Sequence, residues 1–258
     1  MQFVRRFDEA QAVETGYRGY SAQTVSHQES ALIIGSWIAG GGCGPELHYH
    51  DSDQSYFLVS GAMKVRIDSA VHDVQAGSFV HIPAGVAHCN WNETSDTEFH
   101  FELIVPAPKP GAPLLHFVES PSDAPGSDRT GFVRTTDDDD FQVPEAFPGM
   151  GFVPLLTNDN SVVNAIRVAP GGSGPGAHIH EFDQYYVVLE GTLQVEVALE
   201  RHSAPAGSVV LLPAGVPHRQ WNEGPEREAH LALLAPAPRD EVPWDRGVDF
   251  AFNGQDHS

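Results

Sequence analysis

The chain has 258 residues, which is enough for one large domain or for two small ones that each bury a core. Its composition, 41% hydrophobic and 19% charged, is ordinary for a globular protein, while a formal net charge of -21 argues against nucleic acid and anionic membranes as partners. No stretch has the length and apolarity of a signal peptide or a membrane span, so a cytoplasmic protein is expected.

Short apolar segments bounded by glycine or proline follow one another along the first half of the chain. They alternate with polar residues or are rich in β-branched residues, which is the pattern of strands. The strands predicted in this half are residues 56–59, 63–67, 78–82 and 99–105. No long amphipathic helix is predicted, and 25 glycines with 20 prolines suit many turns.

The segment between residues 109 and 149 carries the acidic run Asp137–Asp140. A solvated turn is predicted there, because the spacing of a calcium-binding loop is missing. Phe3-Val4-Arg5 is echoed by Phe132-Val133-Arg134, which suggests that each domain opens with such a strand. A domain boundary is therefore predicted near residue 120, giving an N-terminal domain of residues 1–120 and a C-terminal domain of residues 121–258.

The second half repeats the strand pattern of the first, at a constant offset of 130 in residue number. The strands predicted there are residues 186–189, 193–197, 208–212 and 230–234. The repeat runs from about residue 32 to 108 and from about residue 162 to 238. Such self-similarity indicates two similar domains, and all-β halves of this size close as a sandwich or a barrel.

The repeat also carries a set of metal-ligand side chains among its turn residues. The first copy consists of His48, His50, Gln54, Gly61, Gly77, Pro83, Gly85, His88 and Asn92. The second copy consists of His178, His180, Gln184, Gly191, Gly207, Pro213, Gly215, His218 and Asn222. Three imidazoles and one amide that return at fixed spacing indicate a binding site in each half.

The spacing of the histidines suits a metal. His48 and His50 are two residues apart, so both imidazoles point to the same side of a strand. His88 arrives from a separate strand, and Gln54 can add an amide oxygen, which leaves part of an octahedral shell open for water or substrate. We expect one divalent transition metal in each domain: Fe, Mn, Ni, Co, Cu or Zn.

These motifs resemble those of the cupin superfamily. The first cupin motif has a His-x-His pair, a Glu and a closing glycine, and the second has Gly, Pro-x-Gly, His and Asn at fixed spacing. Both copies match these positions except the Glu, and the resemblance covers roughly three quarters of the chain. The resemblance implies an all-β bicupin, with two tandem jelly-roll β-barrels and a metal inside each.

Both halves depart from the family at one position, where the usual Glu is Gln54 or Gln184. An amide leaves the metal its full positive charge, which strengthens Lewis acidity, and it cannot serve as a general base. The isomerase of bacilysin biosynthesis resembles this chain in having three His and one Gln, whereas quercetin-type dioxygenases usually keep the Glu. The alternative that each glutamine only hydrogen-bonds to a ligand stays open.

Four further side chains are catalytic candidates: Tyr56, Tyr186, His100 and His230. The tyrosines share the inferred inward parity and could hydrogen-bond a substrate, with core packing as the alternative. The two histidines could shuttle protons or could simply be packed in a barrel. Asn92 and Asn222 are interpreted as residues that fix a turn.

The sequence therefore predicts a metal-dependent bicupin enzyme. The leading hypothesis is a dioxygenase that acts on a small enol, phenol or carboxylate at the metal. The alternatives are a Lewis-acid isomerase or lyase of the bacilysin type, and a non-enzymatic cupin that binds a ligand or a metal. The expected partners are a small-molecule substrate and, since edge strands need cover, a second copy in a homodimer.

Overall fold

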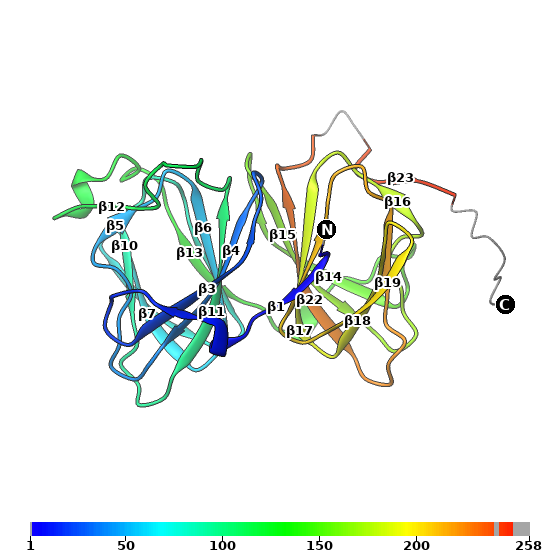
Figure 1. Ribbon diagram of the computed structural model, residues 1–258, viewed down its shortest axis with the longest axis horizontal. Helices are drawn as coiled ribbons and strands as arrows, with labels where there is room; N and C mark the ends of the chain where they lie inside the picture. The colour runs from blue at the N-terminus through cyan, green and yellow to red at the C-terminus, as the bar shows by residue number, and fades with distance from the viewer. Residues whose placement is uncertain (1, 240–242, 250–258) are drawn as a thin grey trace. The chain divides into compact units, whose positions relative to one another are not determined.

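The computed structural model describes residues 2–239 and 243–249. They form two compact units of antiparallel sheets (Figure 1). The N-terminal unit holds residues 5–140 and 155–161, and the C-terminal unit holds residues 2–4, 141–154 and those from 162 onward. Among the described residues the only helical elements are short 3-10 turns, so the all-β prediction is confirmed.

Two sheets build the N-terminal unit, with strand orders β13-β9-β6-β11-β4-β3-β2 and β12-β5-β10-β7-β8. Its strands are β2 (Val13–Glu14), β3 (Tyr20–His27), β4 (Leu32–Ile38), β5 (His48–Tyr49), β6 (Asp53–Ser60), β7 (Ala62–Ile67), β8 (Ala70–Gln75), β9 (Ser78–Ile82), β10 (His88–Trp91), β11 (Glu98–Val105), β12 (His116–Phe117) and β13 (Phe132–Thr135). The 3-10 turns are η1 (Glu9–Gln11), η2 (Pro121–Asp123) and η3 (Asp138–Asp140).

Two sheets also build the C-terminal unit, with strand orders β1-β20-β17-β22-β15-β14 and β19-β18-β21-β16-β23. Its strands are β1 (Val4–Arg6), β14 (Met150–Thr157), β15 (Val162–Val168), β16 (His178–Ile179), β17 (Asp183–Glu190), β18 (Thr192–Val197), β19 (Glu200–Pro205), β20 (Ser208–Leu212), β21 (His218–Trp221), β22 (Glu228–Ala235) and β23 (Arg246–Gly247). The strands predicted in the two halves lie within these elements.

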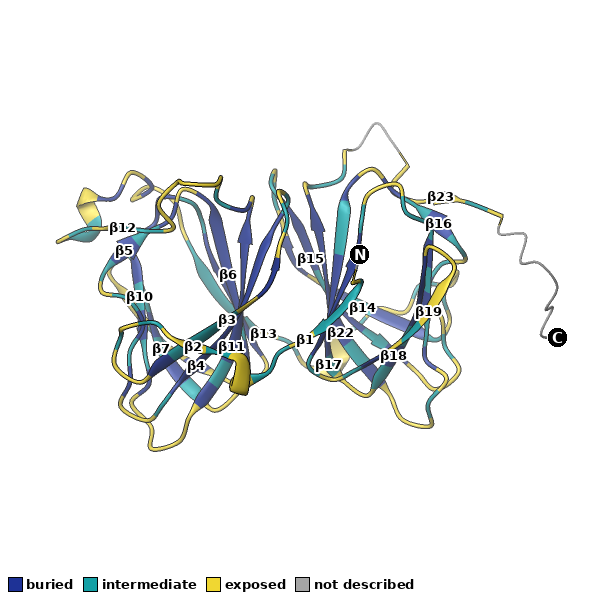
Figure 2. Cartoon of the chain, viewed as in Figure 1, coloured by how far each residue is buried: buried dark blue, intermediate teal, exposed yellow. Residues whose placement is uncertain are grey.

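Alternating burial along the strands shows which side chains face the interior. In β7, Met63, Val65 and Ile67 are buried while the residues between them are partly exposed. In β10, His88 and Asn90 are the buried pair. Figure 2 shows the same contrast, with buried strand segments and exposed turns. The histidine parity predicted from the sequence thus places these rings inside.

The echoed segments both form strands, but each pairs within the sheet of the other half. β1 joins the sheet of the C-terminal unit beside β20, and β13 joins that of the N-terminal unit beside β9, with Val133 opposite Val80. Gly126 also donates a backbone hydrogen bond to Gly85. The boundary predicted near residue 120 therefore lies inside the unit that holds residues 5–140.

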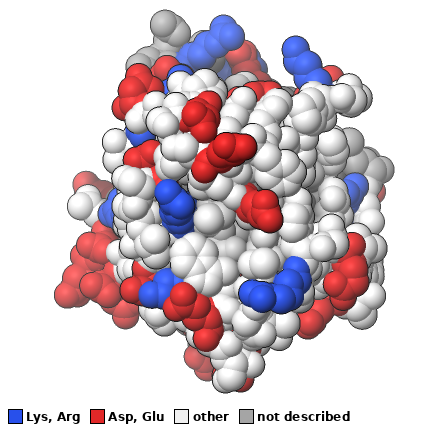
Figure 3. Space-filling model, turned by 90° about the vertical axis from the view of Figure 1, so that its left-hand side faces the viewer, with Lys and Arg blue, Asp and Glu red and all other residues white. Residues whose placement is uncertain are grey.

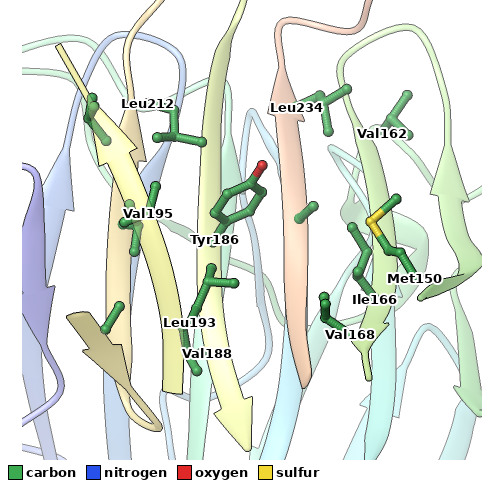
Figure 4. Packing of buried hydrophobic residues seen from close by; sticks show 14 of the residues in the cluster. Met150, Val162, Ile166, Val168, Tyr186, Val188, Leu193, Val195, Leu212 and Leu234 are labelled. Atoms are coloured by element: carbon green, nitrogen blue, oxygen red, sulfur yellow. The ribbon is translucent and has the colours of Figure 1, made fainter. Parts of the chain in front are cut away.

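Apolar side chains from both sheets fill the interior of each unit. Figure 4 shows this core in the C-terminal unit, where Tyr186 stands among Leu193, Val195 and Val188 and its hydroxyl points toward the end of the cluster that holds Leu212 and Leu234. Tyr56 occupies the equivalent place in the core of the N-terminal unit. Each tyrosine hydroxyl reaches the glutamine two residues before it, Gln54 in one unit and Gln184 in the other.

The loop after each second motif is closed by its asparagine. Asn92 Nδ2 donates to the carbonyls of Ile38 and Asp96, and its Oδ1 accepts from the backbone N–H of Thr94. Asn222 makes the equivalent bonds to Val168 and Glu226. These contacts agree with the turn-fixing interpretation of both residues.

Charged side chains are distributed unevenly over the surface. On the face drawn in Figure 3, acidic side chains gather in groups and basic side chains lie among them. The acidic run Asp138–Asp140 forms an exposed 3-10 turn, as expected of a solvated turn. No helix in the described part of the chain is both long and apolar enough to span a membrane.

Candidate metal centres

The first histidine group lies in the N-terminal unit, where β5 meets β10. His48 pairs with His88 across these strands, and His50 follows at the end of β5. All three side chains are buried, with exposed fractions of 2% for His48, 1% for His88 and 4% for His50. One ring nitrogen from each lies within 4.8 Å of the others, so the predicted convergence of the three imidazoles is present.

Backbone carbonyls fix the tautomer of each ring. Nδ1 of His48, of His50 and of His88 each lies close to one backbone carbonyl oxygen. The distances are 2.6 Å to Glu46 for His48, 2.6 Å to Leu114 for His50, and 2.9 Å to Val86 for His88. Because a carbonyl can only accept, each Nδ1 carries the proton and each Nε2 keeps a lone pair. Nε2 of His50 and of His88 is buried without a hydrogen-bond partner.

The rings are also neutral at neutral pH. Burial, followed by the charge of His50, lowers the pKa of His48 to about 4. Burial likewise lowers the pKa of His88 well below its ordinary value, and that of His50 in the same direction. Neutral imidazoles with converging lone pairs fit a divalent cation, since unpartnered buried acceptors cost free energy.

Gln54 on β6 presents its amide beside this group. Tyr56 donates its hydroxyl hydrogen to Oε1 of Gln54 at 3.0 Å, and Nε2 of Gln54 donates to Oε2 of Glu102 at 2.6 Å. The Gln54 side chain also raises the pKa of His50, against the larger effect of burial. Because Glu102 holds the nitrogen end, the oxygen end remains for the metal. The role of Gln54 as a ligand stays a prediction.

Glu102 is a residue that the sequence analysis missed. It is buried in β11 and accepts hydrogen bonds at Oε1 from Ser36 Oγ at 2.7 Å and from the Tyr20 hydroxyl at 3.0 Å. Its counterpart at the 130 offset is Ala232, so the search for repeated polar residues passes over it. A search for polar residues present in one copy only would have found it.

His100 joins Glu102 to a second buried carboxylate. Its Nδ1 lies 3.0 Å from both carboxylate oxygens of Glu98, and its Nε2 lies 3.6 Å from Oε1 of Glu102. Burial alone disfavours the charged ring, but the Glu98 charge and the contact with Glu102 outweigh it and raise the pKa of His100 to about 10. Burial is likewise outweighed for Glu102, whose pKa falls to about 2 through its contact with His100.

This buried ion network predicts a fall in stability at alkaline pH. The pKa of His100 is 6.5 in the unfolded chain and about 10 in the folded protein, so its protonation stabilises the fold fully below pH 6.5. This contribution to stability is lost as the pH rises through about 10. The free energy of unfolding of the metal-free protein should therefore fall over that interval, as measured by denaturant unfolding. NMR should show the His100 ring still protonated at about pH 8. Loss of its proton near pH 6.5, with a flat stability curve, contradicts the prediction.

The second histidine group repeats this arrangement in the C-terminal unit. His178 pairs with His218 across β16 and β21, and both are buried together with His180. Their ligand nitrogens also lie within 4.8 Å of one another. The Nδ1 atoms lie 2.8, 2.6 and 3.0 Å from the carbonyl oxygens of Gly176, Phe182 and Val216. Burial, followed by the charge of His178, lowers the pKa of His218 to about 3.

Gln184 directs its amide oxygen at this second group. Oε1 of Gln184 lies 3.1 Å from Nε2 of His180 and 3.4 Å from the Tyr186 hydroxyl. Since the proton of His180 is on Nδ1, two lone-pair atoms face each other at 3.1 Å. The spacing is close to that of two ligands on one ion, and the role of Gln184 as a ligand stays a prediction.

The two amides have different surroundings. Behind Gln54 stand the polar residues Tyr20, Ser36 and Glu102, whereas their counterparts behind Gln184 are Met150, Ile166 and Ala232. In the C-terminal unit Gln220 instead accepts a hydrogen bond from the Tyr186 hydroxyl at 2.8 Å. The sites therefore share their histidines and differ in what holds the amide.

The four catalytic candidates lie behind the amides. The hydroxyls of Tyr56 and Tyr186 contact Gln54 and Gln184. The rings of His100 and His230 pack on these tyrosines, with centroids 5.1 and 4.6 Å apart. Nδ1 of each histidine is held by the nearest glutamate, Glu98 or Glu228. Catalytic roles for all four stay predictions, and the geometry favours support of the amide ligand.

A match to a known family accompanies this geometry. The Cupin domain family matches residues 37–105 and residues 164–235, one stretch in each half. The chain is a bicupin of the cupin superfamily. The Streptomyces coelicolor protein SCO3923, itself uncharacterized, is 31% identical to the bicupin over 83 residues, which are 32% of this chain and 77% of that protein.

Solved structures show the same fold. A Pseudomonas aeruginosa protein described as glyoxylate-induced aligns with a TM-score of 0.70 at 19% identity, over 95% of the bicupin and 88% of that chain. Oxalate decarboxylase from Lactobacillus farciminis aligns with a TM-score of 0.68 at 15% identity, over 96% of the bicupin and 89% of that chain. A point mutant of salicylate 1,2-dioxygenase from Pseudoaminobacter salicylatoxidans aligns with a TM-score of 0.65 at 13% identity, over 81% of the bicupin and 72% of that chain. At these identities the likeness concerns the fold alone.

Proposed function

We propose that this bicupin is a metal-dependent dioxygenase that acts on a small enol, phenol or carboxylate. The observation that carries the proposal is the pair of buried groups of three histidines, each of which brings one ring nitrogen from every member within 4.8 Å of the others. In the N-terminal unit His48, His50 and His88 would hold the metal, with the Gln54 amide oxygen as a further ligand. When bound, the metal supplies Lewis acidity and, for a redox-active element, oxygen chemistry.

The surrounding residues suit an anionic substrate. An amide at position 54 leaves the positive charge of the site uncompensated, which favours a carboxylate, phenolate or enolate. Gln54 cannot take up a proton, and the carboxylate of Glu102 is occupied by the Gln54, Ser36 and Tyr20 hydrogen bonds. A substrate that arrives already ionised needs no base at this site.

Oxygen dependence tests the proposal. Metal-loaded protein is supplied with a panel of phenols, enols and hydroxy- or ketocarboxylates, in air and without oxygen, while substrate loss and oxygen uptake are followed. We expect one O2 consumed for each substrate converted, with both oxygen atoms in the product, and no conversion without oxygen. The His50→Ala protein serves as the control for adventitious metal chemistry.

A Lewis-acid isomerase or lyase is the second candidate. It is favoured by the presence of an amide, in place of a carboxylate, beside both histidine groups. Conversion without oxygen, and no oxygen uptake in air, supports this candidate and eliminates the dioxygenase. Binding of substrates without conversion under either condition supports the non-enzymatic alternative.

A further inference from the structure

The repeat of the two halves extends beyond the motifs, to a strand at the edge of each histidine group. In the C-terminal unit β23 lies beside β16, with His178 opposite Gly247 and Ile179 opposite Arg246 (Figure 1). In the N-terminal unit β12 pairs with β5 in the equivalent register. Continuing the register of β23 by one step places Asp245 opposite His180, so this strand delivers a carboxylate to the histidine group.

The carboxylate of Asp245 faces a ring nitrogen that carries a lone pair. Oδ1 of Asp245 lies 3.6 Å from Nε2 of His178, while Nδ1 of His178 donates to the carbonyl of Gly176 at 2.8 Å. Because Nδ1 is committed to a carbonyl, Nε2 is the ring nitrogen that remains for a ligand, and it faces the carboxylate. A spacing of 3.6 Å lets a single cation contact both atoms.

Two further observations place the carboxylate at the site. Its neighbour Arg246 lies 3.5 Å from Glu181, and Val248 donates a backbone hydrogen bond to Ala177 at 2.9 Å, so the segment is anchored next to Asp245. Burial, followed by the charge of Asp245, raises the pKa of the Tyr186 hydroxyl, which itself contacts Gln184. The charge of Asp245 thus acts on the interior of the histidine group.

We propose that Asp245 is a carboxylate ligand of the C-terminal metal centre, which makes the two centres of this chain unequal. The proposal rests on the proposed binding of metal by both histidine groups. Leu115 occupies the position equivalent to Asp245, so the N-terminal centre has no such ligand there. Binding through both of its oxygens, the Asp245 carboxylate would fill the positions that three histidines and Gln184 leave open in an octahedral shell. Closed ligand sets are typical of structural metal sites, whereas catalytic sites keep a position open for substrate. The C-terminal centre is accordingly structural, and the N-terminal centre takes the substrate.

Metal affinity tests this assignment without reference to activity. In His50→Ala protein, which retains only the C-terminal centre, Zn2+ affinity is measured by competition with a chelator, with and without Asp245→Asn. We expect Asp245→Asn to weaken binding at least about tenfold, because even groups that hold ligands from behind contribute that much. The absorption spectrum of bound Co2+ should change as well, since an oxygen ligand is lost.

The matched control is Asp249→Asn, which removes the same charge from an exposed position of the same segment. It should leave Zn2+ affinity within about twofold, the effect expected of a screened surface charge. The side chain of Asp245 is 46% exposed, so the metal-free Asp245→Asn protein should melt like its parent. Equal affinities with and without Asp245 overturn the assignment alone. Absence of metal from the wild-type protein overturns the proposed function with it.

Discussion

Alanine at His50 is expected to lower turnover by about a thousandfold, because a catalytic metal contributes several kcal/mol to the barrier and each 1.4 kcal/mol is about tenfold. His50 supplies a buried, unpartnered Nε2 to the N-terminal group. Alanine at the equivalent His180 is expected to leave turnover within about threefold while lowering the melting temperature, since a structural metal stabilises the fold.

The two variants are a matched pair, because each removes the second histidine of a His-x-His motif at the end of an equivalent strand. Metal content should fall by one ion per chain in both. Turnover with a converted substrate is then compared at saturating substrate. Loss of turnover in the His180→Ala protein, with the His50→Ala protein still active, reverses the assignment of the two centres.

Glutamine at position 102 is expected to lower both stability and metal affinity. Glu102 accepts hydrogen bonds from Gln54, Ser36 and Tyr20, and it lies beside the buried ring of His100. Removing the charge of one partner in a buried ionic network costs about 3–5 kcal/mol. The free energy of unfolding of the metal-free protein, from denaturant titration, should fall by that order.

Metal affinity separates a positioning role from a merely structural one. If Glu102 acts by holding the Gln54 amide, Glu102→Gln should weaken metal binding at the N-terminal centre about 10- to 100-fold. Glu102→Gln added to Gln54→Ala should then weaken it no further, because the group it positions is gone. Additive losses of metal affinity, or no loss in the single variant, contradict the positioning role. His180→Ala protein isolates the N-terminal centre for this measurement.

The histidine groups were predictable because their geometry follows from local rules. Side chains two residues apart on a strand lie on the same face of the sheet. The constant offset of 130 between the two halves predicts that both form the same arrangement of side chains. The observed pairings of His48 with His88 and of His178 with His218 follow the same offset. The positions of the strands and of Gln54 and Gln184 were predicted from the same alternation and repeat.

The difference between the two centres was not predictable in this way, because it lies in residues that the repeat does not share. Glu102 reaches Gln54 only because β11 lies beside β6, where Glu102 stands opposite Tyr56. Asp245 lies beyond the repeat, which ends at about residue 238, and it contacts His178 only because β23 pairs with β16. The pairing of β1 with β20 and of β13 with β9 likewise joins strands from different halves of the sequence, so local patterns did not predict it.

By itself the sequence determined the doubled β-fold, the family and the two sets of converging imidazoles, since periodicity and spacing act within a few residues along one strand. Only the tertiary structure decided which carboxylate lies near each histidine group, since hydrogen bonds between neighbouring strands join residues that are 48 apart for Gln54 and Glu102. A strand pattern specifies which face a side chain takes, and the packing of the sheet specifies which side chains meet there.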